Sequence, residues 1–131
     1  DIIIEEIERQ RDNPCFRIFS SIRFESFLVL LKHCKFIIGN SSAGIREAPI
    51  YSIPTINIGD RQNGRFSHET IINTKESKEE ILNAIKRVEQ IPYAPSDYFG
   101  DGKSTERFIN LINSPKIWNL NIQKKFIDMD Y

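Results

Sequence analysis

Two turns of this 131-residue chain have the residue types of an anion-binding site. The first turn, Gly39-Asn40-Ser41-Ser42-Ala43-Gly44, contains only small residues and leads into a helical pattern. Small side chains let a ligand approach the backbone, and the start of a helix offers unpaired N–H groups and the positive end of the helix dipole. The turn is therefore a candidate site for a phosphate group.

Glu47, about one turn into the predicted helix, adds a carboxylate to this arrangement. A carboxylate at this position can accept hydrogen bonds from ribose hydroxyls while the amides hold a diphosphate. The alternative is structural, since Ser41 and Ser42 can simply cap the helix and Glu47 can complement its dipole. Glu47 favours the nucleotide, and the residue types leave both explanations open.

The second turn, Gly59-Asp60-Arg61-Gln62-Asn63-Gly64-Arg65, follows another apolar stretch. Its two guanidinium groups suit phosphate, because the planar fork of arginine donates two hydrogen bonds at once. A solvated surface loop is the alternative. Ligands of doubly wound sheets bind beyond the carboxyl ends of the strands, so we expect Arg61 and Arg65 to face the same ligand as the first turn.

Short apolar strands and amphipathic helices must position these turns. The expected strands span residues 16–20, 36–38, 54–58 and, more weakly, 70–72. The expected helices span residues 1–10, 23–34, 44–51, 78–89, 104–113 and 119–128, with a loop at 93–103. Apolar strands that alternate with helices imply a parallel sheet covered on both faces. We predict the α/β class, a Rossmann-like doubly wound parallel sheet in residues 1–92, and a loop with C-terminal helices in residues 93–131.

Composition argues against several classes of function. The 18 basic and 18 acidic residues cancel without forming blocks, so we expect no electrostatic attraction to nucleic acid or to an anionic membrane. No apolar run reaches the ~20 residues that span a bilayer, and no leader sequence opens the chain, so the expected compartment is cytoplasmic. Because the chain starts at Asp1 inside a helical pattern, and its only methionine is Met129, we expect a further upstream domain.

The cysteines and histidines give little sign of chemistry. Cys15 and Cys34 lie in apolar stretches without the spacing of metal ligands, so both are expected to be inert, buried thiols. His33 and His68 have no evident carboxylate partner, and we expect structural or surface roles for them. No metal site is therefore predicted.

The two turns resemble those in the C-terminal domain of the hydrolysing UDP-N-acetylglucosamine 2-epimerases of the sialic acid pathway. Residues 36–65, FIIGNSSAGIREAPIYSIPTINIGDRQNGR, carry the resemblance, which extends more weakly to residues 18–31 and 98–102. It implies the C-terminal half of a glycosyltransferase-B architecture, in which two Rossmann-like domains face each other across a cleft. The expected partners are the missing N-terminal domain and further copies in a homo-oligomer. The residues expected to pack toward that domain are Trp118, Ile122, Phe126 and Ile127.

The resemblance also implies a reaction. UDP-GlcNAc and water would give N-acetylmannosamine and UDP, through elimination of UDP followed by hydration, without a metal or another cofactor. The acid and base residues of the family come mostly from the other domain, so we expect no catalytic residue here, and the chain alone would bind UDP without turnover. The expected UDP contacts are Ser41, Ser42 and Gly44 at the diphosphate, Glu47 at the ribose, and Arg61 and, more weakly, Arg65 at the phosphates.

Three alternatives stay open at this point. The first is the same reaction on a di-acetamido UDP sugar, because the residues that read the sugar would lie largely in the other domain. The second is the C-terminal domain of a UDP-sugar glycosyltransferase, which would need an acceptor site. The third is a binding module without a catalytic parent.

Overall fold

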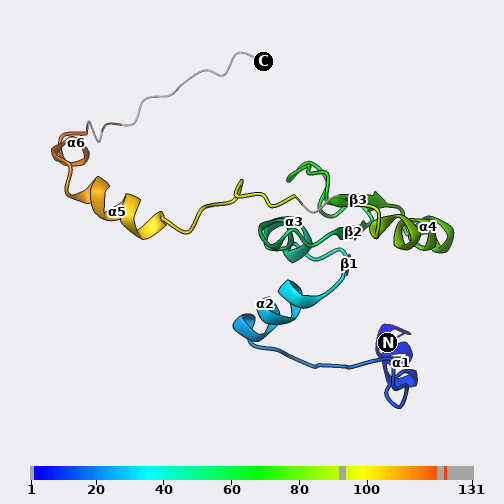
Figure 1. Ribbon diagram of the computed structural model, residues 1–131. Helices are drawn as coiled ribbons and strands as arrows, with labels where there is room; N and C mark the ends of the chain where they lie inside the picture. Colours follow the sequence, from blue (N-terminus) through cyan, green and yellow to red (C-terminus); the bar gives the residue numbers. More distant parts are fainter. Residues whose placement is uncertain (1, 92–93, 121–122, 124–131) are drawn as a thin grey trace. The chain divides into compact units, whose positions relative to one another are not determined.

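The computed structural model describes residues 2–91, 94–120 and 123, shown along the chain in Figure 1. Its internal contacts divide the chain into two compact units, Asp1–Ser96 and Asp97–Tyr131. Each unit has its own packing. The predicted domain boundary between residues 92 and 93 stays a prediction.

The larger unit is built on a parallel sheet of three strands, β1 (Ile37–Gly39), β2 (Thr55–Ile58) and β3 (Ile71–Thr74), in the order β1-β2-β3 (Figure 1). The register pairs Ile38 with Ile56 and Ile56 with Ile72. Three expected strands, at 36–38, 54–58 and 70–72, are thereby confirmed to within two residues at either end. Because the strands are parallel, the turns that follow β1 and β2 leave from the same edge of the sheet.

Helices cover both faces of this sheet. They are α2 (Phe24–His33), the one-turn helix α3 (Ala43–Arg46), the 3-10 helix η1 (Ala48–Tyr51) and α4 (Lys78–Val88). Neighbouring side chains of a strand point to opposite faces, so the adjacent Phe36 and Ile37 enter different cores. One core packs Leu31, Ala48 and Ile53 against Ile37, and the other packs Ile56, Ala84 and Val88 against Phe36 and Ile72. The predicted α/β, Rossmann-like doubly wound sheet is confirmed.

Two expected elements of the larger unit are wrong in detail. Residues 16–20 form no strand, and their apolar side chains Phe16, Ile18 and Phe19 are exposed, because no strand of the described chain pairs with them. The helix expected at 44–51 is divided into α3 and η1. Pro49 explains the division, since proline has no N–H group to donate to the carbonyl four residues earlier.

The first helix, α1 (Ile2–Arg9), confirms the expectation for residues 1–10 but buries none of its residues. Its isoleucines Ile3, Ile4 and Ile7 are exposed, although their spacing is that of one apolar helix face. The amphipathic pattern therefore predicted the correct element, and the apolar side of this helix is exposed in the described structure.

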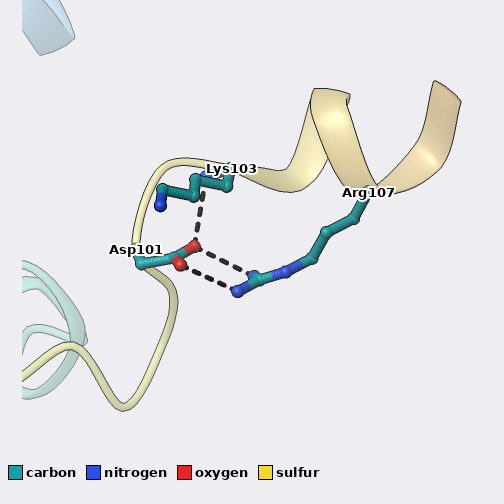
Figure 2. A network of polar contacts seen from close by, with 3 residues as sticks. All are labelled: Asp101, Lys103 and Arg107. Atoms are coloured by element: carbon teal, nitrogen blue, oxygen red, sulfur yellow. Dashed lines mark hydrogen bonds and ion pairs between the residues drawn. The ribbon is translucent and has the colours of Figure 1, made fainter. Parts of the chain in front are cut away.

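The smaller unit contains α5 (Ser104–Ile112) and α6 (Pro115–Trp118). The carboxylate of Asp101 accepts the N–H of Lys103 at 3.1 Å and two guanidinium hydrogen bonds from Arg107 at 2.9 and 2.7 Å (Figure 2). These donors, first the Lys103 N–H group and then Arg107, hold the pKa of Asp101 below its ordinary value. The contacts fix the loop directly before α5, and the expected helix at 104–113 is confirmed.

The helix expected at 119–128 falls almost entirely outside the described residues, and positions 119 and 120 are not helical. The same holds for Ile122, Phe126 and Ile127, whose expected packing lies outside the described residues. Trp118 is described and is exposed, with its indole N–H donating to the carbonyl of Ile112 at 2.8 Å.

The two cysteines differ in environment. Cys34 is partly buried beside the first core, its thiol donates to the carbonyl of Leu31 at 3.1 Å, and burial raises its pKa. Cys15 is exposed, so the expectation of two buried thiols is wrong for this residue. The reason is the irregular, exposed segment in which Cys15 lies.

This difference predicts two rates of thiol modification. Under native conditions we expect Cys15 to react with an aromatic disulfide reagent at the rate of a free thiol. Cys34 should react more slowly, because the thiolate is the nucleophile and burial of Cys34 disfavours the thiolate. The measurement is the absorbance of the released chromophore over time, compared between the wild type and Cys15→Ser. A fast phase that persists in Cys15→Ser would contradict the assignment.

A second prediction concerns Gly44. The residue is buried, and a Cβ atom added to it would lie 2.6 Å from Cγ2 of Thr55, whose hydroxyl donates to the carbonyl of Gly44 at 2.6 Å. Gly44→Ala therefore overpacks the contact between α3 and β2, and we expect it to lower the free energy of unfolding by roughly 1–3 kcal/mol.

The matched control is Gly44→Ala combined with Thr55→Ser, which deletes the clashing methyl group and keeps the hydroxyl. Urea denaturation of the wild type, both single variants and the double variant measures the coupling between the two positions. We expect the double variant to recover most of the loss caused by Gly44→Ala. Additive losses would show that the Thr55 methyl group is not the cause.

Candidate functional site

The turn after β1 presents two serines and two open backbone amides. Ser41 is exposed and Ser42 is half-buried, and α3 begins directly after them. Ser42 makes no capping hydrogen bond with its side chain, while Oγ of Ser41 accepts from the N–H of Ala43 at 3.3 Å. Within the described residues, the N–H groups of Ser41 and Ser42 donate to no protein acceptor. The turn can therefore offer both amides and the Ser42 hydroxyl to an anion.

The backbone groups of Gly44, unlike the N–H groups of Ser41 and Ser42, are bonded within the protein. Its N–H group donates to the carbonyl of Ser41 at 3.2 Å, and its carbonyl accepts the hydroxyl of Thr55. The absence of a side chain lets α3 lie directly against β2. The expected contact between Gly44 and a diphosphate stays a prediction, and the open amides of the turn are those that precede this residue.

Glu47 lies where α3 ends and η1 begins, and it is half-buried. This is the negative end of α3 and the positive end of η1, so the two helices act on a carboxylate in opposite directions. The Glu47 side chain also makes no capping hydrogen bond to η1. The expected contact between Glu47 and a ribose stays a prediction beside the structural explanation.

The second turn is bonded directly to the first. The side chain of Gln62 is 2 % exposed, and its Nε2 donates to the carbonyl of Asn40 at 2.8 Å. Asn40 immediately precedes the two serines, so the turns after β1 and β2 are adjacent as expected. Sequence reasoning missed Gln62, because a neutral side chain between charged and glycine residues carries no signal of burial.

Arg61 and Arg65 flank the buried Gln62 and are both exposed. The loop around them is compact, with the N–H of Asn63 donating to Asp60 at 2.9 Å and the N–H of Arg65 donating to Gln62 at 3.3 Å. A buried residue between two exposed arginines anchors the loop while the guanidinium groups remain in solvent. The loop can therefore deliver positive charge next to the open amides of the first turn.

The two histidines lie outside this arrangement. His33 is exposed on the last turn of α2. His68 is half-buried, with Nδ1 2.9 Å from the hydroxyl of Thr70 and its ring stacked on Phe66 at 5.8 Å between centroids. Across the described ranges, no three His, Cys, Asp or Glu side chains come close enough together to hold a metal ion. A search of the same ranges finds no helix that is both long and apolar enough to cross a bilayer.

Comparison with known proteins identifies several nucleotide-sugar 2-epimerases as relatives of this chain. It is 47% identical over 132 aligned residues to the UDP-N-acetylglucosamine 2-epimerase of Neisseria meningitidis serogroup B, an alignment that covers 98% of this chain and 35% of the relative. It is 31% identical to the UDP-N,N'-diacetylbacillosamine 2-epimerase (hydrolyzing) of Legionella pneumophila, over 86% of this chain and 30% of the relative. The chain thus spans about a third of the length of these relatives.

A solved structure shares the fold. The UDP-GlcNAc 2-epimerase of Methanocaldococcus jannaschii superposes with a TM-score of 0.69 at 22% sequence identity, over 85% of this chain and 32% of that one. This likeness agrees with the expected half of a glycosyltransferase-B architecture. The sequence model of the UDP-N-acetylglucosamine 2-epimerases matches residues 1–113. The chain therefore belongs to the UDP-N-acetylglucosamine 2-epimerase family.

Proposed function

We propose that this chain is the nucleotide-binding portion of a hydrolysing UDP-N-acetylglucosamine 2-epimerase. The complete enzyme converts UDP-GlcNAc and water to N-acetylmannosamine and UDP, by eliminating UDP across C1 and C2 and then hydrating the resulting glycal. The observation that carries the proposal is the hydrogen bond from Gln62 to Asn40, because it joins the turn with the open amides to the loop that contains the two arginines.

The chemistry of each group suggests its role. The N–H groups of Ser41 and Ser42, with the Ser42 hydroxyl, bind the diphosphate as hydrogen-bond donors. Arg61 neutralises the phosphate charge, and Arg65 does so more weakly. The carboxylate of Glu47 accepts from the ribose hydroxyls, a neutral part of the nucleotide that does not repel it. Gly44 lets α3 lie against β2 and so holds the turn whose amides bind the diphosphate.

The elimination needs a base for the C2 proton and stabilisation of the departing UDP. The residues of this chain serve the second need, since amide and guanidinium donors stabilise the charge that develops on the leaving diphosphate. We assign the acid and base to an N-terminal domain of the same enzyme, so that this chain alone binds UDP without turning over substrate. The proposal includes no metal or other cofactor.

The remaining parts of the proposal concern the whole protein. Residues 93–131 pack back toward the N-terminal domain, and the protein acts in the cytoplasm as a homo-oligomer. A second candidate is the same reaction on a UDP sugar that carries two acetamido groups. One observation favours it: the relative from Legionella pneumophila is named for a di-acetamido substrate. A glycosyltransferase activity has no comparable support.

Product analysis tests the reaction. Incubation of the complete gene product with UDP-GlcNAc in H₂¹⁸O should release UDP and free N-acetylmannosamine, with ¹⁸O at the anomeric carbon because water adds to C1. The same assay with a UDP-di-acetamido sugar separates the two substrate classes. UDP-N-acetylmannosamine as the product would overturn the hydrolysing reaction, and transfer of the sugar to an acceptor would overturn the epimerase assignment.

Binding measurements test the assigned ribose contact. We expect Glu47→Ala to weaken UDP binding by roughly tenfold to a hundredfold, the range for a hydrogen bond to a charged group. Titration calorimetry of the complete gene product with UDP measures the change. The matched control is Glu69→Ala, an exposed carboxylate two residues before the amino end of β3 and hence near the opposite edge of the sheet. Unchanged affinity in Glu47→Ala would remove the contact.

A further inference from the structure

One polar atom of Gln62 is unused by the protein. A backbone carbonyl can only accept hydrogen bonds, so the bond to Asn40 requires the Nε2 end of the side chain and directs Oε1 elsewhere. Oε1 is buried and has no hydrogen-bond partner in the described structure. Buried polar atoms are nearly always satisfied, so an unsatisfied acceptor indicates a missing donor from a water or a ligand.

Gln62 lines a hollow of about 320 Å³ at the carboxyl end of the strands. This volume lies at the lower end of the ~300–1,000 Å³ typical of small-molecule sites, so it suits one ring-sized group better than a whole nucleotide sugar. Its position is fixed relative to the proposed diphosphate site, because Gln62 is bonded to the residue before Ser41. The walls are formed by Gln62, Asn63, Gly64, Phe66, Ser67 and Asn73.

None of these wall residues is charged. Amide and hydroxyl groups surround one aromatic side chain, and Asn73 is held in place by a hydrogen bond from Asn57 at 2.8 Å. The neighbouring hollow, of about 510 Å³, differs: Asp60, Glu76 and Glu80 line it with only one lysine, Lys75. A pyrophosphate is repelled there, whereas a neutral group with hydroxyl and amide donors matches the hollow at Gln62.

We infer that the hollow beside Gln62 binds the neutral glycosyl group of the nucleotide sugar, with Oε1 of Gln62 accepting from a sugar hydroxyl or acetamido N–H. The inference rests on the proposed function and extends it, since it gives this chain a part in recognising the sugar. The same side chain then has two roles. Its Nε2 positions the turn that holds the diphosphate, and its Oε1 contacts the sugar.

The experiment separates these two roles through a ratio of affinities. Titration calorimetry on the complete gene product measures the Kd of UDP and the Kd of a UDP-GlcNAc analogue in which CH₂ replaces the scissile C1 oxygen, so that no turnover occurs. The ratio of the two constants reports the contribution of the sugar alone. A purely structural change in the diphosphate turn alters both constants together and leaves the ratio unchanged.

Two variants probe the hollow. Gln62→Met keeps the length of the side chain but removes both the Oε1 acceptor and the Nε2 donor to Asn40, so its effect is read from the ratio. Ser67→Tyr fills the hollow from an exposed wall position and leaves the Gln62 side chain in place. We expect each to lower the preference for the glycosyl analogue over UDP roughly tenfold, the effect of one lost buried hydrogen bond. The matched control is Asn83→Tyr, an exposed position on α4, and it should leave the ratio unchanged.

Each outcome bears on a different claim. An unchanged ratio in Gln62→Met or in Ser67→Tyr overturns the inference. If Gln62→Met weakens the binding of UDP and of the analogue equally, Gln62 only positions the turn and the inference is wrong. Failure of the wild type to bind UDP contradicts the proposed function itself. Circular dichroism of every variant at the titration temperature confirms that the compared proteins are folded.

Discussion

A partly buried hydrogen bond between a side chain and the backbone, from Gln62 to Asn40, joins the two turns on which the proposed site depends. Such a bond contributes only about 1 kcal/mol net, but leaving the buried Nε2 of Gln62 without an acceptor would cost about 1–3 kcal/mol. The asymmetry makes the contact a constraint on geometry more than a source of stability. It also explains why the arginine loop remains compact although both arginines are in solvent.

The sheet supplies the frame for this bond. Parallel pairing of β1, β2 and β3 brings the carboxyl ends of the strands to one edge, and the close approach of Gly44 to Thr55 fixes α3 against β2. The turn is thereby held by its own strand, by its helix and by its neighbour loop, and the amides of Ser41 and Ser42 can stay open.

The predictions from sequence were best where a pattern reports burial on one face. The run 36–38 and the α4 spacing gave their elements correctly, because apolar periodicity follows directly from packing. Residues 16–20 have the same apolar character, but a strand also needs a partner, and sequence pattern does not show whether one is present. Gln62 was missed because its burial comes from one long-range hydrogen bond, and the exposure of Cys15 was missed because a neighbouring apolar residue was taken to imply a core.

The brevity of α3 changes how an anion would be held at this site. A macrodipole sums over aligned peptide units, and the four residues before the interruption at Pro49 supply few of them. Attraction at this turn is consequently short-ranged and directional, set by where individual N–H bonds point. The contribution of these amides therefore depends on the orientation of the phosphate, while the part that salt can screen falls to the exposed guanidinium groups assigned to the same ligand.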